Sequence, residues 1–112
     1  MAATEEFRDP FERITAKTAK KLIEEGGLIV VDVRESAEWN QGHISESIHI
    51  PLGTLMSRPR EVLQQDGIIF VCAEGIRSAV ACEVAAAIGK TRLYNLEGGT
   101  REWVKQGFPV TR

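Results

Sequence analysis

Residues 68–78 read Ile-Ile-Phe-Val-Cys-Ala-Glu-Gly-Ile-Arg-Ser, and this stretch indicates the class of fold. Its first five residues form an apolar run without polar alternation, which is typical of a strand buried on both faces of a sheet. A second run of the same character covers residues 28–33. Both runs predict central parallel strands with helices on each side.

Helical and extended segments alternate along the rest of the chain. Thr15 is a suitable N-cap for a helix that reaches about Glu25. Shorter strands are expected at residues 47–50 and 92–96, and further helices at residues 36–41, 59–65, 76–88 and 100–106. This alternation predicts an α/β domain with a mostly parallel sheet.

Length and composition indicate one globular domain. The chain has 112 residues, of which 43% are hydrophobic and 27% are charged. We expect a lead-in over residues 1–12 and a single domain over residues 13–112. The net charge of −2 argues against binding to nucleic acid, which requires a basic excess.

The sequence also predicts the compartment. No apolar run is long enough for a membrane span, and the N-terminus lacks the basic start and apolar core of a signal peptide. Two cysteines are too few for a disulfide framework. We therefore expect a cytoplasmic protein that does not bind membranes and whose cysteines are free thiols.

Cys72 stands where a buried strand ends and a helix begins. Ligands of open α/β sheets bind beyond the carboxyl ends of the strands, and a helix N-terminus there offers unpaired N–H groups. Gly75 lets the backbone curl its amides toward one point, and Arg77 adds positive charge, whereas Glu74 opposes it unless it faces solvent. We expect a Cys72 thiolate, which is the nucleophilic form; the alternative is a buried core cysteine.

The loop that begins at Cys72 resembles the active-site loop of single-domain rhodaneses, which are sulfurtransferases. Residues 31–34 (Val-Asp-Val-Arg), 39–44 with 47–52, and 96–99 with Trp103, Gly107, Pro109 and Val110 resemble three further motifs of that family, in the same order. The resemblance covers Ile14 to Val110. It implies a three-layer fold with a central five-stranded parallel sheet and helices on both faces.

The resemblance also implies a reaction. Cys72 would take the outer sulfur of thiosulfate or of a persulfide donor and pass it to a thiol or to cyanide. The substrate-binding loop would comprise Ala73, Glu74, Gly75, Ile76, Arg77 and Ser78, and neither a metal nor an organic cofactor is implied. Because Glu74 would repel dianionic thiosulfate, a persulfide or a sulfur-carrier protein is an alternative donor.

Three other functions remain as alternatives. A non-catalytic binding module would keep the fold without turnover. A redox enzyme or anion reductase would form a disulfide, with Cys82 as the second thiol. Related phosphatases have five residues between cysteine and arginine, whereas four separate Cys72 from Arg77, which argues against that function.

The remaining chemistry-bearing residues have plainer explanations. We expect Cys82 to be a core residue, His43 a hydrogen-bonded scaffold residue, and Asp32 and Arg34 an ion pair at the rim of the sheet. His43 and His49 lack the spacing to cysteine that a zinc site requires. Trp39 and Trp103 are expected as core anchors, and Gly98-Gly99 as a turn and helix cap.

Overall fold

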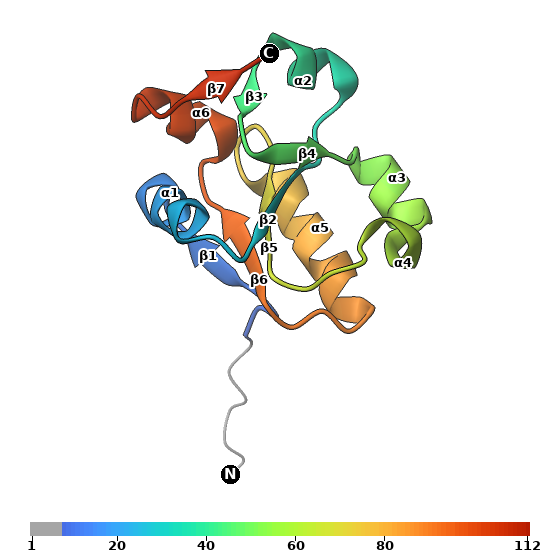
Figure 1. The fold of residues 1–112 in the computed structure, drawn as a ribbon. Coiled ribbons are helices and arrows are strands. Elements are labelled where there is room, and N and C mark those ends of the chain that lie inside the picture. Colours follow the sequence, from blue (N-terminus) through green and yellow to red (C-terminus); the bar gives the residue numbers. More distant parts are fainter. Residues whose placement is uncertain (1–7) are drawn as a thin grey trace.

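The computed structural model describes residues 8–112 (Figure 1). Its strands are β1 (Glu12–Ile14), β2 (Ile29–Asp32), β3 (His43–Ile44), β4 (Ser47–His49), β5 (Ile68–Val71), β6 (Leu93–Leu96) and β7 (Val110–Thr111). Its helices are α1 (Ala16–Glu25), α2 (Ser36–Gln41), α3 (Leu52–Ser57), α4 (Pro59–Val62), α5 (Ile76–Ala87) and α6 (Gly99–Lys105).

Five strands form one parallel sheet in the order β1-β6-β5-β2-β4. The two apolar runs that predicted central strands are β2 and β5, which pair with each other inside the sheet. Helices α1 and α6 lie on one side of the sheet, and α3, α4 and α5 lie on the other (Figure 1). The predicted three-layer α/β fold is confirmed.

Each face of the sheet has its own core. Phe70 and Ile68 of β5 pack with α5 and with Leu55 of α3. Ile69 and Val71, which alternate with them along the same strand, pack with α1 and with Trp103 of α6. Both faces of β5 are therefore covered, which is why its sequence shows no polar alternation.

The structure contains short elements that the sequence did not predict. Strand β1 joins the edge of the sheet beside β6, and Phe11 before it is buried, within the range where we expected a lead-in. Helix α3 precedes α4, and α4 ends at Val62 instead of reaching residue 65. Strands β3 and β7 form a separate antiparallel pair. These elements have two to six residues, too few to show a period.

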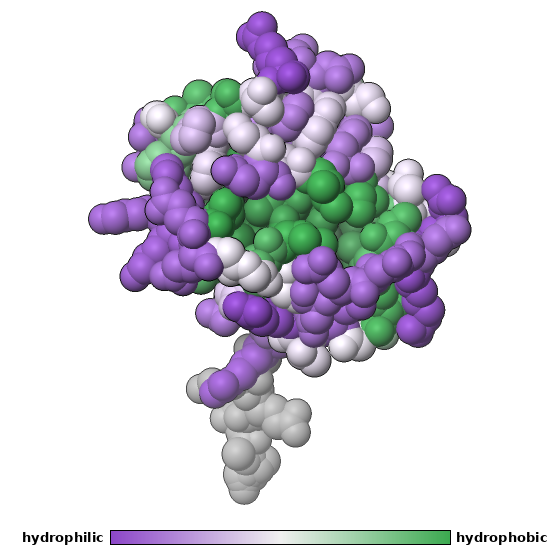
Figure 2. Space-filling view, in the orientation of Figure 1, coloured by the Kyte–Doolittle hydropathy of each residue, from purple (hydrophilic) through white to green (hydrophobic). Residues whose placement is uncertain are grey.

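The carboxyl ends of the sheet strands face α2, β3 and β7, which gather at one end of the molecule with the C-terminus (Figure 1). On the side shown in Figure 2, apolar surface crosses the middle of the molecule over β2 and β4. Strand β4 is an edge strand, and its Ile48 is exposed. Within residues 8–112, no helix has both the length and the apolar character that a membrane span needs.

Candidate active site

The loop after β5 turns sharply into helix α5. Gly75 is the N-cap of α5 and has a left-handed backbone with φ of 102°. A side chain at this position would also be crowded, because its Cβ would lie 3.3 Å from the backbone nitrogen of Gly98 and 3.3 Å from the carbonyl oxygen of Leu96. Glycine is therefore required both for the turn and for the close approach.

This turn directs hydrogen-bond donors at the Cys72 sulfur. The backbone N–H of Gly75 donates to Sγ at 3.0 Å, and the hydroxyl oxygen of Ser78 lies 3.3 Å from Sγ. Burial alone would raise the pKa of the Cys72 thiol, but hydrogen bonds from the Ser78 hydroxyl and from the amides of Ser78, Glu74 and Gly75 outweigh it. The pKa of Cys72 is lowered overall, so the loop favours the thiolate.

Cys72 lies at the base of an opening, although the residue is only 1% exposed. A cavity of about 220 Å³ is lined by Cys72, Ala73, Glu74, Ile76 and Arg77. The sulfur is therefore shielded from bulk water yet borders a space that a small molecule can enter.

Helix α6 holds the loop from behind. The N–H of Thr100 donates to the carbonyl of Cys72 at 2.8 Å, and the N–H of Arg101 donates to the carbonyl of Ala73 at 3.1 Å. A Cβ at Gly99 would lie 2.3 Å from the Cys72 carbonyl oxygen. The predicted turn and cap at Gly98-Gly99 is confirmed, and Gly99 also permits this contact.

Asn95 of β6 is a second support, which the sequence analysis missed. Its side chain is fully buried, and its Nδ2 donates to the carbonyl of Gly75 at 3.0 Å. Its Oδ1 is buried without a hydrogen-bond partner among the described residues. A polar residue inside the otherwise apolar segment 93–96 was the available signal, because buried polar groups usually serve a specific contact.

Arg77 makes a different contact from the one expected. Its two terminal nitrogens donate to both carboxylate oxygens of Glu38 in α2, each at 2.8 Å. The Arg77 hydrogen bond is the largest influence on Glu38 and lowers the pKa of its carboxyl to about 2. The positive charge is thus largely compensated, and the donors of Ser78 and the loop amides, not Arg77, dominate the lowering of the Cys72 pKa.

Glu74 also has a partner. Its carboxylate pairs with Arg101 of α6, and the Glu74 side chain is about half exposed. The negative charge that we expected to weaken the site is therefore partly compensated and partly screened by solvent.

The rim of the sheet is braced as predicted. Nε of Arg34 donates to Asp32 Oδ1 at 3.0 Å, and its NH2 group donates to Asp32 Oδ2 at 2.9 Å and to the carbonyl of Gly42 at 2.7 Å. His49 donates from Nε2 to the carbonyl of Arg34 at 2.7 Å. These bonds fix the segment that carries α2 beside the loop.

The two tryptophans differ in how deeply they are buried. Trp103 is 1% exposed and is a core anchor, as expected. Trp39 is only partly buried, and its ring stacks on His43 and His49, so the expectation of a core anchor is wrong there. His43 bonds through Nδ1 to the carbonyl of Trp39 and is a scaffold residue, as expected.

Cys82 is a core residue. Its side chain is fully buried in the cluster beneath α5, and both cysteines are free thiols. Burial raises the pKa of the Cys82 thiol well above its ordinary value. Cys82 is therefore a neutral, apolar-packed thiol at physiological pH.

Comparison with known proteins now identifies the family. The sequence profile described as the Rhodanese-like domain matches residues 15–106. The chain belongs to the rhodanese-like domain family. Among solved structures, the crystal structure of a rhodanese-related protein from Thermoplasma volcanium has a TM-score of 0.78 and 32% identity, covering 89% of this chain and 97% of that one.

Two curated relatives of this rhodanese-like domain carry informative names. A protein of Allochromatium vinosum named sulfurtransferase is 29% identical over 82% of this chain and 86% of its own length. The putative sulfur carrier protein YrkF of Bacillus subtilis is 33% identical over 75% of this chain, which spans only 45% of that protein. Family and relatives together support sulfur transfer in general.

Proposed function

We propose that this rhodanese-like domain is a sulfurtransferase in which Cys72 is the nucleophile and the sulfur carrier. The observation that carries the proposal is the pair of donors at the sulfur, the Gly75 amide at 3.0 Å and the Ser78 hydroxyl at 3.3 Å. An ionised thiol is the form that attacks a sulfur atom.

The reaction has two steps. The Cys72 thiolate attacks the outer sulfur of thiosulfate or of a persulfide and forms a new bond between Sγ and that sulfur. The sulfur–sulfur bond of the donor breaks, and sulfite or a thiolate leaves with the electron pair. A thiol or cyanide then attacks the outer sulfur of the Cys72 persulfide and restores the thiolate.

The loop from Ala73 to Ser78 binds the reacting sulfur in this proposal. Donors fixed before the reaction stabilise negative charge without having to reorganise. A Cys72 persulfide anion needs this stabilisation as much as the thiolate does, because its charge lies on the outer sulfur. The adjoining cavity of about 220 Å³ offers space for that atom.

The alternatives find less support in the contacts. A redox cycle between the two cysteines needs a reactive Cys82 thiol, but Cys82 is fully buried, and burial raises the pKa of its thiol well above the ordinary value. A phosphatase needs a free arginine for its phosphate, whereas Glu38 holds Arg77 through both terminal nitrogens. Sulfur transfer needs neither feature.

Turnover with thiosulfate and cyanide tests the proposal. The reduced protein should produce thiocyanate, and Cys72→Ser should abolish it. Cys82→Ser is the matched control and should retain most of the activity, because that thiol lies outside the reacting loop. Full turnover in Cys72→Ser, or loss of turnover in a folded Cys82→Ser protein, would contradict the proposal.

A further inference from the structure

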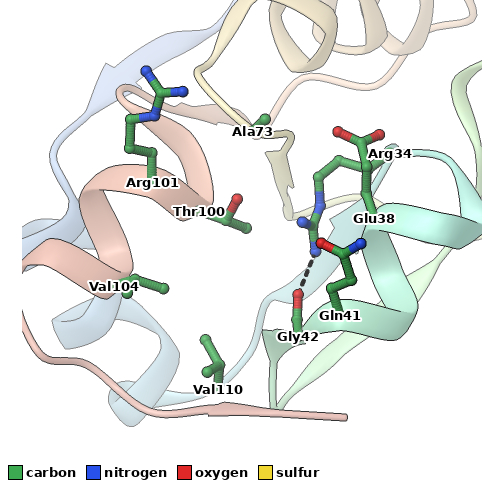
Figure 3. Close-up of a pocket in the computed structure, with 9 residues that line it drawn as sticks. All are labelled: Arg34, Glu38, Gln41, Gly42, Ala73, Thr100, Arg101, Val104 and Val110. Atoms are coloured by element: carbon green, nitrogen blue, oxygen red, sulfur yellow. Dashed lines mark hydrogen bonds between the residues drawn. The ribbon is translucent and has the colours of Figure 1, made fainter.

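A second and larger cavity adjoins the loop, and the proposed function assigns it no role. Its volume is about 540 Å³, and it lies between α2 and α6 with β7 at its edge (Figure 3). Its lining residues are Arg34, Glu38, Gln41, Gly42, Ala73, Thr100, Arg101, Val104 and Val110. We call this cavity the side groove.

The side groove adjoins the opening over Cys72. Ala73 lines both cavities, and its side chain is a single methyl group. Glu38 lines the side groove and forms hydrogen bonds with Arg77, which lines the smaller cavity. A molecule whose sulfur lies at Cys72 can therefore extend across Ala73 into the side groove.

The side groove presents apolar surface to solvent. Val104 is 56% exposed and Val110 is 43% exposed. Figure 3 shows that the side chains of Val104 and Val110, together with Thr100, point into the groove from α6 and β7. Neighbouring exposed valines lower the free energy of binding for a ligand that covers them with carbon atoms.

Charge in the side groove is balanced. Arg34 is paired with Asp32, Arg101 with Glu74, and Glu38 with Arg77. Each charged side chain that lines the groove is thus held by an opposite charge. A small dianion gains little here, whereas a mostly uncharged organic molecule avoids the desolvation of free charges.

The volume of the side groove also favours an organic molecule over a small anion. A donor as small as thiosulfate needs only the opening over Cys72. A volume of about 540 Å³ falls within the range of cavities that bind small organic molecules, roughly 300–1,000 Å³.

We propose that the side groove binds the carbon skeleton of an organic persulfide, whose outer sulfur reaches Cys72 across Ala73. This inference rests on the proposed function and names its donor class. The Cys72 thiolate attacks the outer sulfur of R–S–SH, and the Sγ–S bond forms. The donor's sulfur–sulfur bond breaks, and R–S⁻ leaves with the electron pair, so no external oxidant or reductant is needed.

The test compares two donors on three proteins. The donors are thiosulfate and the persulfide of N-acetylcysteine methyl ester, an organic probe whose carbon skeleton carries no charge. The proteins are the unaltered chain, Val104→Asn, and the control Val80→Asn on α5, whose valine is also exposed but lies outside the groove. Asparagine is neutral, so long-range electrostatics at Cys72 stay unchanged.

The groove variant should lose activity with one donor only. We expect Val104→Asn to lower kcat/KM about tenfold for the organic persulfide, as expected when apolar contact in a pocket is lost. With thiosulfate it should match Val80→Asn. Equal effects of the two variants on the organic donor would overturn the inference, as would sulfur uptake from thiosulfate alone. In both cases the proposed function stands. Failure of both donors to load Cys72 would refute both proposals.

Discussion

The chemistry of the site depends on one sulfur atom and the donors around it. Burial disfavours a Cys72 thiolate, and four hydrogen bonds from the loop reverse that preference. Ser78 supplies two of them, one from its hydroxyl and one from its backbone amide. A donor that is fully buried, as Ser78 is, cannot be replaced by water at low cost.

Replacing the Ser78 hydroxyl should weaken the thiolate. We expect Ser78→Ala to raise the pKa of Cys72, because it removes a hydrogen bond to a charged group, and such a bond contributes about 1.5 kcal/mol or more. The pH dependence of the alkylation rate measures this pKa. Ser57→Ala, an exposed serine on α3, is the control and should leave the profile unchanged.

The Arg77–Glu38 ion pair should influence the pKa of Cys72 less than Ser78 does. Replacing both residues with glutamine removes opposite charges together, so the shift in the Cys72 pKa should be smaller than that of Ser78→Ala. A larger shift in the double variant would mean that Arg77, as first expected from the sequence, is the main electrostatic partner.

At this scale, the sequence predicted what lies close along the chain. Cys72, Gly75 and the start of α5 occupy one short segment, so their spacing alone indicated a loop that curls its amides. Glu38 and Asn95 lie far from that segment and reach Arg77 and Gly75 only through tertiary packing. These contacts were found only in the structure, because the sequence alone does not show which distant side chains lie together.

Among the elements, α6 acts as a brace for the loop that follows β5. Its N-terminal amides donate hydrogen bonds to the carbonyls of Cys72 and Ala73, and the space beside those carbonyls has no room for a side chain at position 99. Helix α6 begins 27 residues after Cys72. The position of the loop therefore depends on a helix that is distant in the sequence, through the hydrogen bonds from Thr100 and Arg101.

Filling the space at Gly99 should separate α6 from the loop. Gly99→Ala combines a Cβ at 2.3 Å from an oxygen with a positive φ of 58°, so we expect a loss of about 3 kcal/mol in the free energy of unfolding. Gly26→Ala is the control: its φ is 81°, but no atom lies within 4 Å of the added Cβ. Its cost should be about 1 kcal/mol.

Urea denaturation measures both changes. Equal losses in the free energy of unfolding for the two glycine variants would contradict the role of α6 as a brace. Backbone strain alone would then account for the effect at Gly99.

A second link between elements is Asp66, which precedes β5. Its carboxylate accepts hydrogen bonds from the amides of Thr91, Arg92 and Gly67 and from the Thr91 hydroxyl. The Thr91 amide is the largest influence, and the pKa of Asp66 is held well below its ordinary value. The carboxylate therefore ties the start of β5 to the segment that leads into β6.

The Asp66 bonds should stabilise the fold above about pH 4, where the carboxyl is ionised in both folded and unfolded chains. That contribution should disappear as the pH falls through the lower folded-state pKa. We expect Asp66→Asn to cost about 1 kcal/mol at neutral pH, a small value because the site is solvent-exposed. Unfolding curves at several pH values check this, and a constant difference down to strong acid would contradict it.

For the molecule as a whole, the sequence predicted the three layers but not the short strands β1, β3 and β7. Strands β2 and β5 are apolar on both faces, and their central place followed from that pattern. Strand β1 has exposed Glu12 and Arg13, and β3 and β7 have two residues each, so their pairing depends on neighbours distant in the sequence. The side groove lies between α2 and α6, which the sequence predicted, with β7 at its edge, and it depends on how these distant elements pack together, which the sequence does not show.

This arrangement concentrates the chemistry at one end of the molecule. The loop after β5, the brace from α6 and the ion pair from α2 meet beyond the carboxyl ends of the strands, where ligands of open α/β sheets bind. The central claim is that these parts together make Cys72 a carrier of sulfur.

The intact mass of the protein after a single exposure to a sulfur donor tests this claim most directly. The account predicts that the reduced protein gains the mass of one sulfur atom, that cyanide removes it, and that Cys72→Ala never gains it. A loss of two hydrogens would instead indicate a disulfide. An unchanged mass with both thiosulfate and an organic persulfide would contradict the account.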